Sequence, residues 1–239
     1  AFVVHRLGAR PLEEAHAGLD ARERGTLLHR ALALLWERLQ SHAGLLALDA
    51  PQRAAVIGTS VDAAIESLRG TRADVLTAAF TALERGRLVE LLGQLLELEQ
   101  TRAPFLVVER EAPRAIDFAG LRLRARVDRV DELADGRRVV IDYKTGASTV
   151  ADWLGERPDA PQLPLYALTD PGEVAALAYA SVRAGSVGFV GLADDAALLP
   201  GLQTVQEDRT GAVDLRAMLD AWRRHLGELA AEFLTGHAT

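Results

Sequence analysis

The chain contains no cysteine among its 239 residues, and this absence excludes several kinds of chemistry. Disulfides, thiolate zinc sites, cysteine nucleophiles and iron–sulfur clusters all need the missing thiol. Long apolar runs are missing too. The longest, residues 174–182 with one interrupting serine, is far shorter than the ~20 residues of a membrane span. The sequence therefore predicts no membrane segment, and a cytoplasmic location is the default expectation.

Lysine is almost absent as well. Of the 27 Lys and Arg residues, only Lys144 is a lysine. Biased codon usage favours arginine wherever any cation will serve, so the remaining lysine is expected where a compact ammonium fits and a broad guanidinium does not. The formal net charge of −7 disfavours indiscriminate coating of nucleic acid, but it leaves room for a local basic stripe.

Hydrophobic residues make up 49% of the chain, which is enough for one or two compact domains. Residues 20–103 show mainly the 3.6-residue period of helices. The first helix is expected to start at a capping pattern, Asp20 followed by Glu23, and a break in the helical region is expected near Gly86.

The period changes to two at residue 104, and strands are expected from there to about residue 192. Short helices are expected near residues 150–153 and 162–168, and a closing amphipathic helix at about 212–235. This mixture indicates an α/β protein with a large helical N-terminal part.

Two segments of alternating apolar and charged residues flank a turn signal, Ala-Asp-Gly at 134–136. A three-residue loop at this turn would place Asp128 directly opposite Asp142, whereas a two-residue loop would place them on opposite faces. Facing carboxylates repel each other, and a hard divalent cation is the preferred occupant of such an oxygen site. The register of this hairpin therefore decides whether a metal site can form.

Lys144 shares a strand face with Asp142, because residues two apart in a strand point to the same side. An ordinary surface ion pair would look the same. Four arginines are expected on this face: Arg122, Arg124, Arg126 and Arg138. They indicate either a solvated face or a stripe that follows phosphates beside a metal.

Two further motifs have helical i, i+4 spacing, which places both members on one face. The first is Gly25-x-x-x-His29, in which glycine within a helix suggests a close approach to the backbone. The second is Gln162-x-x-x-Tyr166. Each alone is also typical of an ordinary packed histidine or of a solvated helix turn.

Taken together and in this order, the motifs resemble the RecB-type branch of the PD-(D/E)XK nuclease superfamily, over roughly residues 22–170. The matching segments are Gly25-x-x-x-His29, residues 126–131, residues 142–146 and Gln162-x-x-x-Tyr166. The likeness extends to the C-terminal nuclease domains of AddB-like bacterial DNA repair proteins. It implies a restriction-endonuclease-like mixed central sheet flanked by helices, with residues 1–239 as one nuclease domain. A chain that begins without Met would fit the C-terminal part of a longer helicase-like protein.

The resemblance also implies a DNA nuclease that depends on Mg²⁺ or Mn²⁺ and acts as an exonuclease in DNA repair. The implied metal ligands are His29, Asp128, Asp142 and the carbonyl of Tyr143. Lys144 would orient or deprotonate the attacking water, and the family's additional glutamate is either Glu109 or Glu111. Asp128 and Asp142 are also implied as catalytic residues, and the residues that brace the site and meet DNA are Gln162 and Tyr166.

The implied partners are DNA and a helicase subunit or linked helicase domain. Some relatives clamp an iron–sulfur cluster with four cysteines, which this chain cannot do. Two alternatives stay open at this stage. One is a catalytically silent, nuclease-like DNA-binding or scaffold domain of a helicase–nuclease complex, and the other is a sheet protein with an incidental charged face.

Overall fold

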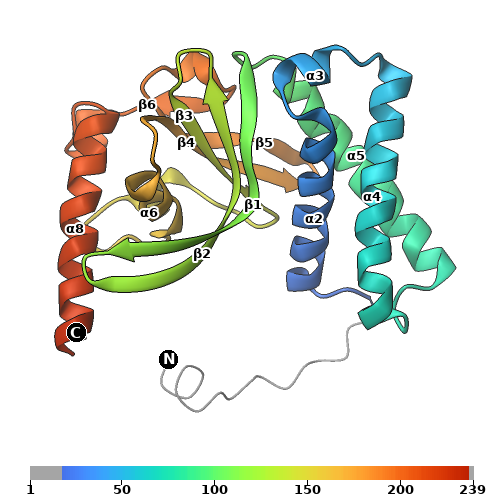
Figure 1. The fold of residues 1–239 in the computed structure, drawn as a ribbon, viewed down its shortest axis with the longest axis horizontal. Helices are drawn as coiled ribbons and strands as arrows, with labels where there is room; N and C mark the ends of the chain where they lie inside the picture. The colour runs from blue at the N-terminus through green and yellow to red at the C-terminus, as the bar shows by residue number, and fades with distance from the viewer. Residues whose placement is uncertain (1–17, 237–239) are drawn as a thin grey trace.

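A computed structural model describes residues 18–236 of the chain (Figure 1). Four helices come first: α2 (Ala21–Leu39), α3 (His42–Leu46), α4 (Ala50–Arg72) and α5 (Ala78–Glu99). Six strands follow, namely β1 (Phe105–Phe118), β2 (Leu121–Leu133), β3 (Arg138–Lys144), β4 (Val174–Arg183), β5 (Ser186–Ala193) and β6 (Leu202–Thr204). The elements between and after them are η1 (Val150–Trp153), α6 (Gln162–Thr169), η2 (Ala196–Leu198), α7 (Glu207–Thr210) and α8 (Leu215–Thr235).

The six strands form one mixed sheet in the order β1-β2-β3-β4-β5-β6. β3 and β4 are parallel and so are β5 and β6, whereas the other neighbouring pairs are antiparallel. The parallel step from β3 to β4 requires a crossover, which η1 and α6 provide. The expected mixed α/β sheet flanked by helices is confirmed.

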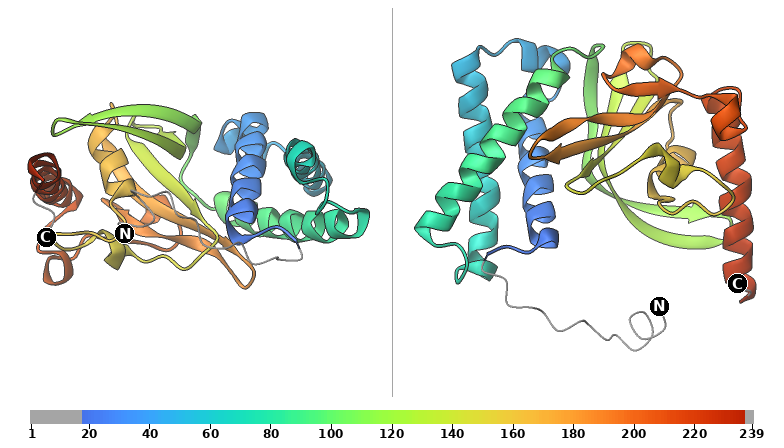
Figure 2. Two further views of the ribbon diagram at one scale, coloured as in Figure 1. Left: turned by 90° about the horizontal axis from the view of Figure 1, so that it is seen from below. Right: turned by 180° about the vertical axis from the view of Figure 1, so that it is seen from behind.

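Helices cover the sheet on two sides, and each side has its own hydrophobic core (Figures 1 and 2). Helices α2 and α5 pack against one face of the sheet, with α4 packed on them, and α6 and α8 pack with the other face. The alternation along β3 divides its side chains accordingly: Val139, Ile141 and Tyr143 face the N-terminal helices, and Val140 faces α6 and α8. Among the described residues, no helix combines the length and apolarity needed to cross a membrane.

The predicted start of α2 is confirmed. The Asp20 side chain accepts from the Glu23 backbone N–H, and the Glu23 side chain accepts from the Asp20 N–H, so both bonds of the capping box are present. The break expected near Gly86 is wrong, because α5 runs through it. Burial of Leu88, Leu92 and their neighbours outweighs the ~1 kcal/mol helix cost of one glycine.

The hairpin between β2 and β3 has the register that opposes the two aspartates. Arg129 pairs with Ile141, and the turn closes through a 2.8 Å bond from the Leu133 N–H to the Arg137 carbonyl. Gly136 takes the left-handed conformation, with φ of +84°. The three-residue loop is therefore confirmed. The ladder ends at Arg129 and Ile141, and its register, continued by one residue, places Asp128 opposite Asp142, whose charges interact.

A buried ionic cluster anchors this hairpin to α5. The Arg129 guanidinium donates to Glu99 at 2.6 Å and to Asp131 at 2.6 and 2.8 Å, and it lies 3.7 Å from the centre of the Trp36 ring. Arg102 joins the same two carboxylates, so two cations balance two anions. The side chains of all four charged residues have zero exposure. Such a cluster tolerates loss of a member poorly, because the remaining charges stay buried.

We expect Glu99→Gln to lower the free energy of unfolding by ~3 kcal/mol, since it leaves two buried guanidiniums facing one carboxylate. Urea unfolding monitored by circular dichroism measures the change. Glu97→Gln is the matched control, because Glu97 is exposed on the same helix, and its effect is expected to stay within ~0.5 kcal/mol. Equal effects of the two substitutions would contradict a stabilising role for the cluster.

Candidate metal centre

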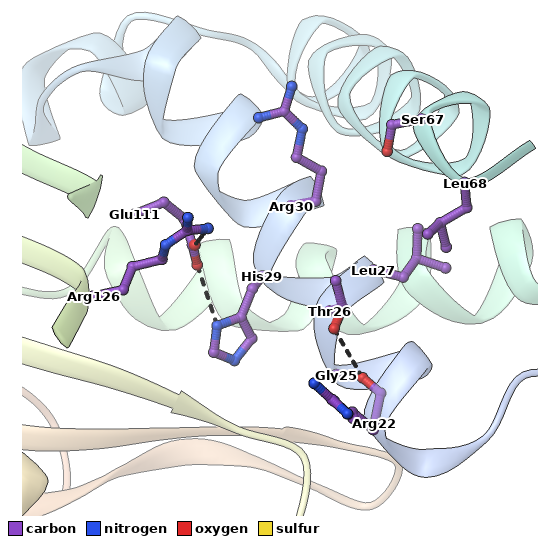
Figure 3. A pocket seen from close by; sticks show the side chains of 10 residues that line it. All are labelled: Arg22, Gly25, Thr26, Leu27, His29, Arg30, Ser67, Leu68, Glu111 and Arg126. Atoms are coloured by element: carbon purple, nitrogen blue, oxygen red, sulfur yellow. Dashed lines mark hydrogen bonds and ion pairs between the residues drawn. The ribbon is translucent and has the colours of Figure 1, made fainter. Parts of the chain in front are cut away.

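The candidate site forms where α2 passes the middle of β1 and β2 and the C-terminal end of β3. His29 projects from α2 beside a pocket that Glu111 of β1 and Arg126 of β2 also line (Figure 3). The Leu27, Leu28 and Leu32 side chains are buried in the core, which fixes the rotation of α2 and points His29 toward the strands.

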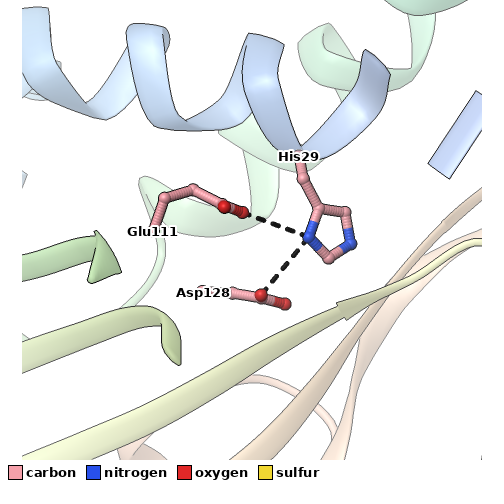
Figure 4. A group of neighbouring side chains, drawn as sticks. All are labelled: His29, Glu111 and Asp128. Atoms are coloured by element: carbon pink, nitrogen blue, oxygen red, sulfur yellow. Dashed lines mark hydrogen bonds and ion pairs between the residues drawn. The ribbon is translucent and has the colours of Figure 1, made fainter. Parts of the chain in front are cut away.

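Three side chains from three elements converge at His29 (Figure 4). Its Nδ1 lies 3.3 Å from Glu111 Oε1 and 3.3 Å from Asp128 Oδ1. One potential ligand atom from each of these residues lies within 4.8 Å of the other two. On the other side of the ring, His29 Nε2 lies 3.1 Å from the Tyr143 carbonyl oxygen. The structure therefore brings four potential ligands into contact.

Tyr143 is held in place at three points. Its backbone N–H donates to Asp128 Oδ2 at 2.8 Å, its carbonyl faces His29, and its phenol oxygen lies 3.4 Å from the Arg129 guanidinium. The buried ionic cluster thus reaches the candidate site through Tyr143. The carbonyl is consequently fixed beside the acidic side chains before any ligand binds.

Asp142 and Lys144 complete the group from the end of β3. Lys144 Nζ lies 2.7 Å from Asp142 Oδ2 and 5.3 Å from the centre of the Tyr179 ring. Asp142 Oδ2 is buried, and Lys144 is the cation that it meets. The Asp142 side chain is only 4% exposed, so it is shielded from bulk water.

The structure distinguishes Glu109 from Glu111, either of which the sequence allowed as the additional glutamate of the site. Glu111 meets His29 and Asp128, whereas Glu109 accepts from Arg114 at 2.5 and 2.9 Å and lies in a different cluster that includes Asp170. The two glutamates therefore belong to different clusters. Glu111 has a left-handed φ of +45°, whereas the register shift between Val107 and Glu109 precedes both residues.

The α6 motif lies beside Asp128. Gln162 Nε2 donates to the Tyr166 hydroxyl at 2.7 Å, and that hydroxyl donates to the Arg126 carbonyl at 2.8 Å. Arg126 precedes Asp128 by two residues on β2. Gln162 and Tyr166 therefore hold the strand that carries Asp128, and the exposed Gln162 also faces solvent.

The charges of the site alter the proton affinities of its members. Burial opposes the charged form of His29, but hydrogen bonds and charges of Asp128 and Glu111 outweigh it and raise its pKa to about 10. The hydrogen bond with His29 lowers the pKa of Glu111. Burial and the neighbouring Asp128 charge raise the pKa of Asp142 to about 6, despite Lys144. Burial also opposes the charged form of Lys144, but the Asp142 carboxylate more than offsets this and raises its pKa.

This donor set suits a hard divalent cation. Carboxylate and carbonyl oxygens are the ligands preferred by Mg²⁺ and Mn²⁺, and an imidazole nitrogen is compatible with Mn²⁺. Adjacent ligands of an octahedral Mg²⁺ ion are ~2.9 Å apart, given its ~2.1 Å bonds. The 3.3 Å separations of His29 Nδ1 from Glu111 Oε1 and Asp128 Oδ1 are close to this spacing, whereas the Tyr143 carbonyl lies at the opposite ring nitrogen, Nε2.

The expected arginine stripe is mostly absent from the site. Arg126 is the member that reaches it, through a 3.1 Å contact with Glu111. Arg138 instead donates to Asp170 at 3.1 Å, and Arg122 is 94% exposed near the far tip of the β1–β2 hairpin. The two-residue period predicted the strand face correctly near Asp128. It could not show that β1 and β2 continue as a long ribbon away from the site.

The sequence profile of the PD-(D/E)XK nuclease superfamily matches residues 1–239, the full length of the chain. Comparison with curated proteins finds no match. Proteins of this superfamily are generally nucleases that hydrolyse phosphodiester bonds, and they use divalent metal ions. The acidic cluster at His29 is consistent with this family match.

Proposed function

The chain belongs to the PD-(D/E)XK nuclease superfamily, and on that premise we propose that it is a divalent-metal-dependent deoxyribonuclease whose active site is the cluster around His29. One observation carries the proposal. His29, Glu111, Asp128 and the Tyr143 carbonyl meet at hydrogen-bond distances, directly beside the ion pair of Asp142 and Lys144.

In this proposal the metal ligands are the side chains of His29, Glu111, Asp128 and Asp142 and the carbonyl oxygen of Tyr143. A bound Mg²⁺ or Mn²⁺ ion would supply Lewis-acid activation of the phosphate and a lowered pKa of the attacking water. Glu111, rather than Glu109, is assigned here because it alone of the two contacts His29 and Asp128.

Lys144 acts in this proposal as a fixed positive charge. Its raised pKa keeps it an ammonium at neutral pH, so it can donate hydrogen bonds to water or phosphate oxygen but does not readily accept a proton. The charge that develops on the phosphate in the transition state is stabilised by such a preorganised donor. A stabilising role is therefore favoured over that of a general base.

Gln162 and Tyr166 are positioning residues. Their hydrogen bonds to each other and to the Arg126 carbonyl hold β2 next to the site, and so keep Asp128 facing Asp142. Gln162 is exposed at the start of α6, and we propose that its amide also contacts the DNA strand.

The finer assignment is a RecB/AddB-type exonuclease that processes DNA ends in repair. It is supported by the order and spacing of the four motifs, from Gly25-x-x-x-His29 to Gln162-x-x-x-Tyr166. The net charge of −7 gives the domain little general affinity for DNA, and a helicase partner or linked helicase domain would deliver the strand. We further propose that residues 1–239 act as one nuclease domain, because both cores pack against the same sheet.

The proposal is tested with end-labelled DNA and the purified chain in Mg²⁺ or Mn²⁺, with EDTA as the metal-free control. Cleavage is expected with either metal and none in EDTA. We expect Glu111→Gln to weaken Mn²⁺ binding about ten-fold, because it removes one charged ligand, whereas Glu109→Gln leaves binding unchanged. Isothermal titration calorimetry measures both affinities.

Two results would contradict the assignment. A wild-type protein that binds DNA but never cleaves it with either metal would support a silent scaffold domain. A larger loss of Mn²⁺ affinity from Glu109→Gln than from Glu111→Gln would place the metal elsewhere.

A further inference from the structure

A pocket of about 420 Å³ lies directly beside His29 and Glu111 (Figure 3). Helix α2 forms one wall, the end of α4 at Ser67 and Leu68 forms another, and the β1–β2 ribbon forms the third. The pocket therefore opens onto the proposed metal centre, and a ligand held in it would lie next to the ligand groups of that centre.

Three arginines line this pocket: Arg22 and Arg30 from α2, and Arg126 from β2. Arg126 pairs with Glu111 at 3.1 Å. Arg22 and Arg30 are exposed, and within residues 18–236 neither guanidinium has an ion-pair partner. Among the described residues, Glu111 is the only carboxylate that lines the pocket, and His29 and Arg126 already engage it. The pocket thus presents unbalanced positive charge on a protein whose net charge is −7.

The two unpaired arginines lie at opposite ends of the pocket (Figure 3). They are eight residues apart on α2, so their Cα atoms are separated by ~12 Å along the helix axis. Between them lie Gly25 and Thr26, which also line the pocket. The Gly25 position is open, since an added Cβ would meet only the Thr145 hydroxyl oxygen at 4.0 Å. An extended chain of anionic groups could therefore lie close to the helix backbone.

We propose that this pocket is a subsite for the phosphodiester backbone of the DNA strand, next to the phosphate that is cut. The inference rests on the proposed nuclease function and adds the path of the strand, which runs along α2 with Arg22 and Arg30 on successive phosphates. Guanidinium groups suit this role, because their planar donors match phosphate oxygens in two-point contacts. Thr26 of α2 and Ser67 of α4 also line the pocket, but their hydroxyls donate to the Arg22 and Ala64 carbonyls, so the arginines are the donors that matter for phosphate.

The test measures binding rather than cleavage, so that its failure is distinguishable from failure of the nuclease assignment. A fluorescein-labelled single-stranded oligonucleotide is titrated with wild type, with the double variant Arg22→Gln/Arg30→Gln, and with Arg24→Gln, all in EDTA. Arg24 is the matched control, because it is exposed on the same helix but does not line the pocket. Thermal unfolding of all three proteins checks that the fold is unchanged.

We expect the double variant to bind at least ten-fold more weakly and Arg24→Gln to bind within two-fold of wild type. The slope of log affinity against log salt should fall by ~0.7 for each phosphate that the variant no longer neutralises. Wild-type affinity in the double variant would overturn the proposal. An equal loss in Arg24→Gln would also overturn it, since that result would reflect general charge. Displacement of the oligonucleotide by inorganic phosphate alone at similar concentration would overturn it too, because it would show a simple anion site instead.

Discussion

Replacing Lys144 with alanine is expected to slow DNA cleavage by about 10³-fold at saturating metal and DNA. The ammonium lies 2.7 Å from Asp142 Oδ2 and is the only lysine of the chain, so no other lysine can supply the charge. Loss of one preorganised donor to a transition-state oxyanion has an effect of about this size. Single-turnover rates with end-labelled DNA measure it.

The variant Lys144→Arg tests whether the site needs only a positive charge or also a compact side chain. The Tyr179 ring lies 5.3 Å from Nζ, and Asp142 is directly adjacent, so the broader guanidinium should displace its neighbours and restore little of the rate. The Lys144 side chain is 35% exposed, and both variants should therefore fold as wild type does. An alanine variant that retains more than a tenth of the wild-type rate would exclude Lys144 from the chemistry.

Asp142→Asn is expected to abolish metal-dependent cleavage and at the same time to stabilise the metal-free protein. Asp142 faces Asp128 across the β2–β3 ladder, and burial together with that neighbouring charge raises its pKa to about 6. Removing one of two facing, buried carboxylates relieves this repulsion. At neutral pH we expect a gain of ~1 kcal/mol in the free energy of unfolding, or ~2–4 °C in Tm. Scanning calorimetry in EDTA measures it.

Added Mn²⁺ should make the wild type more stable than Asp142→Asn, the reverse of the order expected in EDTA. The wild type gains ~2.7 kcal/mol when the metal is present at 100 times its Kd, whereas the variant should gain much less. Asp117→Asn is a control for loss of a surface carboxylate, because Asp117 is 83% exposed near the far tip of the β1–β2 hairpin. Cleavage at the wild-type rate by Asp142→Asn would refute its role as a ligand. A large loss of stability in EDTA would refute the repulsion between the aspartates.

Local signals in the sequence predicted the parts of the site that lie close together along the chain. The Ala-Asp-Gly turn at 134–136 determined the β2–β3 register, because a left-handed Gly136 permits the three-residue loop that opposes Asp128 and Asp142. The i, i+4 spacing of Gln162 and Tyr166 predicted a shared helix face, and the two side chains do form a hydrogen bond.

Other features depend on backbone geometry that periodicity does not encode. Alternation could not distinguish Glu109 from Glu111, and the two differ in their contacts: the left-handed Glu111 meets His29, whereas Glu109 pairs with Arg114. The β1 strand continues past Glu111 to Phe118. The turn that follows, at Ala119 and Gly120, has positive φ at both positions, which returns the chain as β2.

The sequence also did not predict the buried ionic cluster of Arg129, Asp131, Glu99 and Arg102. Charged residues at alternate strand positions usually indicate a solvated face, and these residues are instead enclosed between α5 and the sheet. Their pairing joins segments about 30 residues apart in the chain. The same limitation applies to the pocket along α2, because its three walls come from segments distant in sequence.

The most direct test of the metal centre is an anomalous-difference map from crystals of this chain soaked in Mn²⁺. A single strong peak is predicted within bonding distance of His29, Asp128, Asp142 and the Tyr143 carbonyl, with Lys144 next to it. A chain that cleaves DNA in Mn²⁺ but shows its only peak away from these residues would contradict the assignment.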